Sequence, residues 1–140
     1  MNIPMFIFYI SKIEMKTPLI IALVILIIFL LYQLYRYIMG SQYRISAAEA
    51  RKLLREKQFD IVLDVRTPLE RETLGYYPGS LHMPSADLPK KMPELFPNKS
   101  TRILVYCNNG PRARAATNKL HELGYINAVY IASGHWSLME

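Results

Sequence analysis

The residue types best suited to chemistry gather around the only cysteine of this 140-residue chain, Cys107. The residues that follow it are polar or turn-forming: Asn108, Asn109, Gly110, Pro111 and Arg112. The thiolate form of a cysteine is the nucleophile, and backbone N–H groups, a helix N-terminus and a nearby arginine all favour that form. We therefore predict a nucleophilic cysteine here. The competing interpretation is an inert, buried cysteine, because free cysteine is among the most often buried residue types.

The segments on either side of this loop predict how it is held. Arg102 to Tyr106 contains four apolar residues, two of them β-branched, which is typical of a buried strand in a parallel sheet. From Ala113 to Leu123, apolar residues recur at helical spacing. A strand, a loop and a helix in this order put Cys107 at the carboxyl edge of the sheet, where open α/β sheets place their sites.

The loop Cys107 to Arg112 resembles the active-site loop of the rhodanese family, sulfurtransferases whose loop reads Cys-x-x-Gly-x-Arg between a strand and a helix. Two further regions are similar to segments of that family. They are Leu63-Asp64-Val65-Arg66 with Glu70 and Gly75 to Pro84, and Gly124-Tyr125 with Ala128 to Ile131, Ser133-Gly134 and Trp136. The resemblance covers roughly residues 43 to 138, with the segments in the expected order.

This resemblance implies a sulfurtransferase that carries sulfane sulfur as a persulfide on Cys107. The donor would be thiosulfate or a persulfide, and the acceptor a thiol or another nucleophile, a sulfur-carrier protein among the candidates. The loop amides and Arg112 would stabilise the anionic sulfur and the leaving group. No cofactor is required, and the three histidines do not have ligand spacing with the cysteine, so no metal is expected.

Two charged residues, Asp64 and Arg66, follow the predicted strand Ile61 to Val65 and should lie at the same edge as Cys107. Charged pairs at sheet edges are more often structural than catalytic. We therefore interpret Asp64 and Arg66 as an ion pair that braces the cysteine loop.

Two other functions share these features. A cysteine phosphatase also uses a thiolate in an amide-lined loop that ends in arginine, but its loop has five residues between cysteine and arginine, and here Arg112 closes a loop one residue shorter. The second alternative is a non-catalytic rhodanese-like module that recruits a partner. The retained cysteine favours the enzyme over that module.

The loop departs from its family at Asn108 and Pro111, where many members carry a cationic or hydroxyl side chain and a polar one. Proline has no N–H and asparagine brings no charge, so the loop offers fewer donors to a dianion. We therefore expect weak use of thiosulfate and better use of a persulfide.

The domain around this loop is predicted to be α/β, because strands alternate with helices along the chain. The expectation is a three-layer domain over residues 43–140 with a mainly parallel sheet, and the resemblance implies about five strands. Tyr43 to Ile45 is the first expected strand, and Ser46 begins a capping box and a helix from Ala47 to about Lys57. Between Ser85 and Leu95, we expect a short helix interrupted by prolines.

An apolar segment precedes the domain. Residues 19–38 contain no acidic side chain and only one basic one, and twenty residues at about 1.5 Å each cross a hydrocarbon core of about 30 Å. Tyrosines cluster at its C-terminal end, as in an interfacial aromatic belt. We predict a transmembrane helix over 19–38, an N-terminal segment over 1–18 and a linker over 39–42. A cleaved signal peptide and a buried core helix are the alternatives, and no small-x-small cleavage site follows the apolar run.

Charge predicts the orientation of this helix. Basic residues near its ends are more numerous on the C-terminal side, which by the positive-inside rule favours a single-pass protein with a cytoplasmic catalytic domain. A single cysteine, which excludes an internal disulfide, fits that compartment. The net charge is +6, but from Ser41 onward the 14 basic and 10 acidic residues are scattered. We therefore expect no nucleic-acid partner.

Overall fold

The computed structural model describes residues 16–140. The chain divides into two units, one that extends to Met39 and one from Gly40 to Glu140. The predicted N-terminal segment 1–18 lies, up to residue 15, outside the described residues. The two units are described separately.

The first unit contains one long helix, α2 (Lys16–Ser41). Within it, Lys16–Ile38 has a mean hydropathy of 2.6, which makes it long and apolar enough to cross a membrane. Side chains are exposed along this stretch on every side of the helix. A signal sequence near the N-terminus passes the same test of length and composition.

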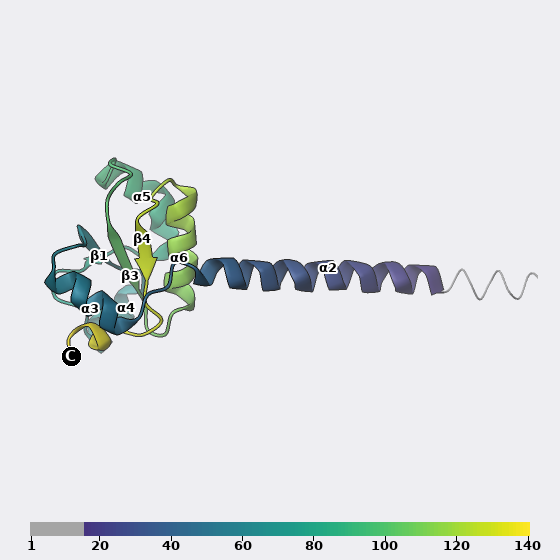
Figure 1. Ribbon diagram of the computed structural model, residues 1–140, viewed down its shortest axis with the longest axis horizontal. Helices are drawn as coiled ribbons and strands as arrows, with labels where there is room; N and C mark the ends of the chain where they lie inside the picture. The colour runs from purple at the N-terminus through teal and green to yellow at the C-terminus, as the bar shows by residue number, and fades with distance from the viewer. Residues whose placement is uncertain (1–15) are drawn as a thin grey trace, which may run out of the picture. The chain divides into compact units, whose positions relative to one another are not determined.

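The second unit is built on a parallel sheet (Figure 1). Its strands are β1 (Ile61–Asp64), β2 (Leu81–His82), β3 (Ile103–Tyr106) and β4 (Ala128–Tyr130), and they lie in the order β2-β1-β3-β4. The register aligns Asp64 with Tyr106, the last residues of β1 and β3. The segments that follow these two strands therefore leave the sheet side by side.

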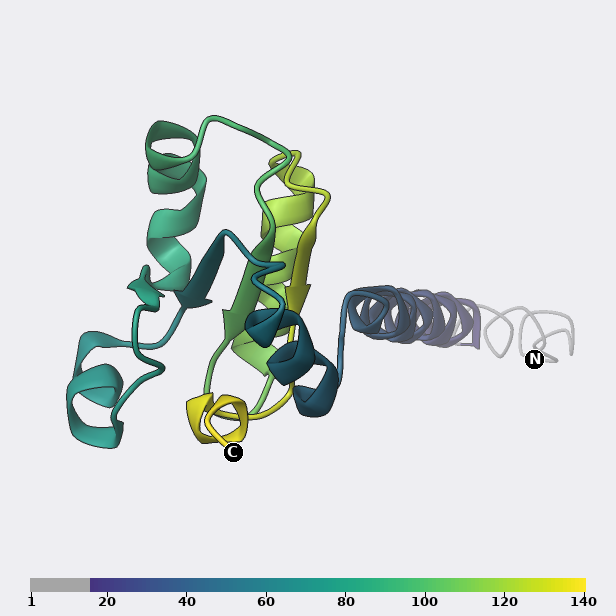
Figure 2. The ribbon, with the colours of Figure 1, turned by 60° about the vertical axis from the view of Figure 1, so that its left-hand side comes forward.

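Helices cover both faces of this sheet (Figure 2). The helices of this unit are α3 (Ala47–Arg55), α4 (Pro68–Leu74), η1 (Ser85–Asp87), α5 (Leu88–Leu95), α6 (Pro111–Glu122) and η2 (His135–Leu138). α5 and α6 pack against each other on one face, and α3 and η2 pack together on the other. The predicted three-layer α/β domain is confirmed.

The core alternates along the central strand β3. Ile103 and Val105 pack in one apolar core with residues of α5 and α6, whereas Leu104 and Tyr106 pack in a second apolar core with residues of α3 and η2. All four side chains are fully buried, as expected for the middle strand of a parallel sheet covered on both faces. This packing fixes the end of β3, and with it the start of the cysteine loop.

The expected number of about five strands is wrong, because the sheet has four. The segment predicted as the first strand forms only an isolated parallel bridge, Arg44 with Tyr130. Two backbone hydrogen bonds join it to β4, from Tyr130 N to Tyr43 O at 3.0 Å and from Ile45 N to Tyr130 O at 2.9 Å. Ser46 then caps α3 by accepting from Glu49 N at 3.1 Å, so the chain turns into a helix before a longer strand can form.

Two helix predictions also need correction. α3 ends at Arg55 and not near Lys57, because Lys57 adopts φ +54° as the chain leaves the helix. α5 is continuous, although an interruption by prolines was expected. Pro89 lies in its first turn, where a missing N–H costs nothing, and the burial of Leu88 and Met92 holds the helix through Pro93.

Candidate active site

The cysteine loop joins the buried end of β3 to the start of α6. Gly110 adopts φ +109°, and a Cβ on this residue would lie 2.9 Å from Ala132 Cα. Only glycine fits both the conformation and the space. The Gly110 N–H donates to Cys107 Sγ at 3.1 Å, so the loop curls its backbone around the sulfur. The expected amide donor for sulfur is therefore present at Gly110.

Cys107 itself has no exposed surface. Along the rest of the loop, Asn108 is half-buried, Asn109 and Pro111 are exposed, and the Arg112 side chain is 39% exposed. Asn109 and Pro111 thus face solvent.

Glu70, on α4, contacts the solvent-facing side of the cysteine loop. We call Glu70 together with Asn108, Asn109, Pro111 and Arg112 the rim. Its carboxylate accepts from Arg112 Nη1 and Nη2, each at 2.7 Å, in a bidentate ion pair. It also accepts from Asn108 Nδ2 at 2.8 Å. The hydrogen bonds from Arg112, followed by those from Thr67, hold the pKa of Glu70 far below its usual range despite partial burial. Glu70 is therefore ionised throughout the neutral range.

Local sequence explains the position of Glu70. Thr67 is the N-cap of α4 and accepts from Glu70 N at 3.3 Å, while Glu70 Oε2 accepts from Thr67 N at 2.9 Å. This reciprocal pair is a complete capping box, with Pro68 in the first turn. The start of α4 thus presents the Glu70 carboxylate to the loop 42 residues further along the chain.

A second group of charges lies beneath the rim, centred on Asp64. Its carboxylate accepts from Arg66 N and Nε at 3.0 Å and from Arg66 Nη2 at 2.8 Å. Arg71 Nη1 at 3.0 Å and the Tyr106 hydroxyl at 2.9 Å complete its contacts. Burial alone would raise the pKa of Asp64, but the hydrogen bonds from Arg66 and Tyr106 outweigh it and keep that pKa low. We call Asp64, Arg66, Arg71 and Tyr106 the buried cluster.

The buried cluster contacts the cysteine loop through Arg66. This side chain is fully buried and donates to Gly75 O at 2.7 Å and to Asn108 Oδ1 at 3.2 Å. Asn108 therefore lies between Arg66, from which its oxygen accepts, and Glu70, to which its amide donates. Asp64 and Arg66 thus contact the cysteine loop through Asn108, and their bracing role stays a prediction.

His135 lies next to Tyr106 of the buried cluster. It is 7% exposed, and its Nδ1 is a buried atom without a hydrogen-bond partner among the described residues. Its ring lies 6.4 Å from that of Tyr106 and in an edge-to-face arrangement 5.7 Å from that of Trp136. Burial, followed by the positive charge of Arg66, lowers the pKa of His135. The imidazole is therefore neutral at pH 7.

Sequence reasoning placed the loop, Asp64 and Arg66 at this edge but did not assign Glu70, Arg71, Tyr106 or His135 to the site. The Thr-x-x-Glu signature at 67–70 was readable, because it is the pattern of a capping box. The contacts of Glu70 with Asn108 and Arg112 were not predictable, since these residues lie in another segment of the chain. Within residues 16–140, the structure contains no group of three or more metal-ligating acidic, histidine or cysteine side chains.

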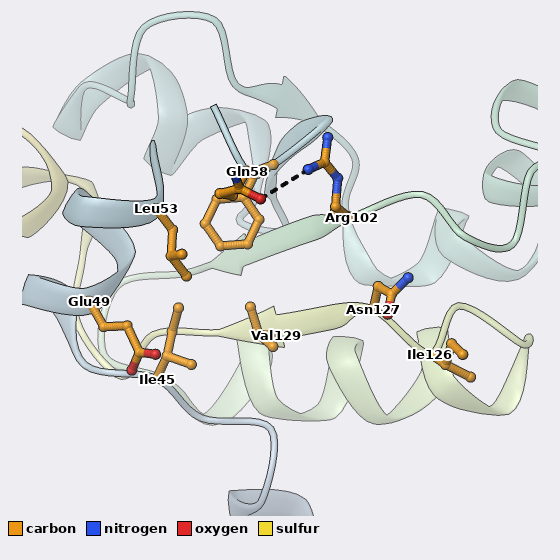
Figure 3. A pocket seen from close by; sticks show the side chains of 9 residues that line it. Ile45, Glu49, Leu53, Gln58, Arg102, Ile126, Asn127 and Val129 are labelled. Atoms are coloured by element: carbon orange, nitrogen blue, oxygen red, sulfur yellow. Dashed lines mark hydrogen bonds between the residues drawn. The ribbon is translucent and has the colours of Figure 1, made fainter. Parts of the chain in front are cut away.

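A hollow of about 420 Å³ lies elsewhere in the domain (Figure 3). Its lining residues are Ile45, Glu49, Leu53, Gln58, Phe59, Arg102, Ile126, Asn127 and Val129. Phe59, Arg102 and Asn127 lie just before β1, β3 and β4, so the hollow is at the amino ends of the strands, opposite the cysteine loop. It takes no part in the chemistry of Cys107.

Comparisons with known proteins agree with this geometry. Residues 46–139 match the rhodanese-like domain family, and the chain belongs to it. The mouse thiosulfate sulfurtransferase/rhodanese-like domain-containing protein 3 is 30% identical over 106 residues, which cover 68% of this chain. The chain spans only 64% of the length of that relative.

Two solved structures share the fold. A rhodanese-related protein from Thermoplasma volcanium is 31% identical with a TM-score of 0.55, and the match covers 69% of this chain and 89% of that one. A human single-domain sulfurtransferase is 26% identical with a TM-score of 0.57, and the match covers 69% and 95% of the two chains. The relatives therefore include proteins named as sulfurtransferases.

Proposed function

We propose that the protein is a membrane-anchored sulfurtransferase that carries sulfane sulfur as a persulfide on Cys107. The observation that supports this most is the Gly110 N–H at 3.1 Å from Cys107 Sγ, inside a loop that Arg112 closes. An N–H aimed at the sulfur stabilises negative charge there, both on the thiolate and on the departing thiolate of the second step.

The chemistry divides into two displacements. In the first, the Cys107 thiolate attacks the outer sulfur of the donor, a sulfur–sulfur bond forms, and the remainder of the donor leaves with the electron pair as sulfite or a thiolate. In the second, an acceptor thiolate attacks the outer sulfur of the Cys107 persulfide and releases the Cys107 thiolate. One sulfur–sulfur bond forms and one sulfur–sulfur bond breaks in each step, so the enzyme needs no oxidant and no cofactor.

Cys107→Ser is the direct test of this mechanism. The hydroxyl is close in size to the thiol but far less nucleophilic at neutral pH, so we expect the variant to fold and to lose sulfur transfer. The assay is the full chain in a mild detergent with thiosulfate and with cysteine persulfide as donors, and mass spectrometry should find the added sulfur on Cys107. Turnover by the serine variant would refute the mechanism.

A non-catalytic, partner-recruiting domain is the second candidate, and the full burial of Cys107 is the observation that favours it. Such a domain would leave Cys107 unmodified by both donors and by a small thiol reagent at neutral pH. A cysteine phosphatase is the third candidate. It would release phosphate from an aryl phosphate, which the sulfurtransferase would not do.

The membrane anchor is proposed from the exposed apolar helix α2 and its hydropathy of 2.6 over Lys16–Ile38. If this helix spans the bilayer, the full chain stays in the membrane fraction at alkaline carbonate, because residues 19–38 contribute favourable insertion energy. Release by carbonate would exclude the anchor. A shortened mature protein that begins after α2 would instead identify a signal sequence.

A cytoplasmic domain is proposed from the basic residues that follow α2. Lys90 is exposed on α5 and suits a labelling test in a chain that carries Lys90→Cys and Cys107→Ser. An impermeant maleimide should label this chain only after the membrane is opened on its cytoplasmic side. Labelling of intact cells would reverse the proposed orientation.

A further inference from the structure

Glu70 has no acceptor capacity left for a substrate. Its two oxygens accept five hydrogen bonds, from Asn108 Nδ2, from both Nη atoms of Arg112, and from the N–H and hydroxyl of Thr67. These bonds also fix the Arg112 guanidinium, because both of its terminal nitrogens donate to the same carboxylate. Much of the positive charge of Arg112 is therefore already balanced by Glu70 before a reactant arrives.

The charged side chains near the cysteine loop nearly balance one another. Three guanidinium groups, those of Arg66, Arg71 and Arg112, meet two carboxylates, those of Asp64 and Glu70. One positive charge remains, and a Cys107 thiolate balances it. A dianion that enters this site therefore finds no net positive charge among these six side chains. If Glu70 were neutral, one net positive charge would remain.

We infer that Glu70 determines the charge of the sulfur donor, and that it selects singly charged persulfides over dianionic donors such as thiosulfate. The inference rests on the proposed sulfur transfer and names its substrate class. Glu70 touches Arg112 and Asn108 rather than the sulfur, so it is a positioning and specificity residue. Its charge opposes a second negative charge on the donor, and its two hydrogen bonds from Arg112 hold that guanidinium in place.

Glu70→Gln is the matched substitution, because glutamine keeps the size of the side chain and also serves in a capping box. We expect the KM for thiosulfate to fall at least about five-fold, the scale of one net hydrogen bond, while that for cysteine persulfide changes by less than about two-fold. Glu72→Gln is the control, since Glu72 is exposed on the same helix and the net charge changes equally. The control should leave both KM values unchanged.

Direct binding separates this inference from the proposed function. Equilibrium dialysis of radiolabelled thiosulfate against the full chain, with Cys107→Ser to prevent turnover, measures anion affinity alone. Adding Glu70→Gln should tighten this binding at least about five-fold, and adding Glu72→Gln should not.

Each outcome bears on one of the two proposals. An unchanged thiosulfate affinity with Glu70→Gln, an equal gain for both donors, or an equal gain from Glu72→Gln would overturn the role of Glu70. A native chain that transfers sulfur from neither donor would overturn the proposed function, while the dialysis result would still decide how Glu70 affects anion binding.

Discussion

Two groups of charges meet at the carboxyl edge of the sheet, and they differ in their contact with water. Asp64 and Arg66 of the buried cluster are fully buried, whereas Glu70 and Arg112 at the rim are 26% and 39% exposed. Asn108 contacts both groups, with its oxygen on Arg66 and its amide on Glu70. The same kind of pair, a carboxylate with an arginine, therefore serves in two environments a few residues apart.

This difference decides what each group does. Ions withdrawn from water depend on one another, so removing one partner of a buried pair leaves an uncompensated charge. At the rim, solvent compensates a lost partner, and the pair matters mainly for the charge that a reactant meets. The buried cluster thus holds the end of β1 against Tyr106 of β3, and in our proposal the Glu70–Arg112 pair sets the charge that a donor meets.

Asp64→Asn should have the largest effect on stability. Asparagine places an N–H₂ group among the donors of Arg66, Arg71 and Tyr106. The fully buried guanidinium of Arg66 and the partly buried one of Arg71 then lose their counter-ion. We expect a loss of about 3–5 kcal/mol in the free energy of unfolding. Urea unfolding of the full chain in a mild detergent, followed by the fluorescence of Trp136, the only tryptophan, measures it.

The same strand offers a matched control. Asp60 precedes β1 and pairs with Arg102 at 2.8 Å, but both side chains are more than two-fifths exposed. Asp60→Asn should therefore leave the unfolding midpoint close to that of the native chain. Equal losses from Asp60→Asn and Asp64→Asn would contradict the comparison, because burial would then make no difference.

The layers of the fold were predictable because they depend on local patterns. The buried strand before Cys107, the helix after it and the order of elements are all carried by apolar spacing. The strand count was not predictable in this way. Whether Tyr43 to Ile45 forms a strand depends on how far it pairs with Tyr130, and the Ser46 cap stops the pairing after one bridge.

The site was predictable only in part for a similar reason. Cys107, Gly110 and Arg112 stand in one short segment, so their proximity follows from the sequence. Glu70 pairs with Arg112 across 42 residues, and the ring of His135 reaches Tyr106 across the sheet end. Such contacts depend on strand register and on the exact end of each helix, and no local pattern encodes them.

His135→Phe should remove a pH dependence from the free energy of unfolding. The pKa of His135 is lowered in the folded chain, so below its ordinary value of about 6.5 the unfolded chain binds more protons. Stability of the native chain therefore rises with pH up to about 6.5, with a slope of at most about 1.4 kcal/mol per pH unit, and is flat above it.

Phenylalanine keeps a ring beside Tyr106 and Trp136 but cannot titrate. Its variant should therefore lose this slope in the pH range just below the ordinary histidine pKa of about 6.5. The lowered pKa values of Asp64 and Glu70 act below their ordinary values of 3.8 and 4.5, outside this range. Unfolding curves at four pH values test the prediction. Parallel stability profiles for the two chains would show that His135 is not the group that titrates.

The smallest expected effect is the stability lost when the rim pair is broken. Glu70→Gln and Arg112→Gln, alone and together, form a double-mutant cycle that isolates their coupling. We expect a coupling below about 1 kcal/mol at pH 7, because both side chains are partly solvated. The pKa of Glu70 is lowered in the folded chain, so this coupling is fully present above pH 4.5 and declines as the pH falls further. A coupling above about 3 kcal/mol is the size expected for a buried ion pair. It would show that the Glu70–Arg112 pair stabilises the fold as the buried cluster does, and the difference between the two groups would disappear.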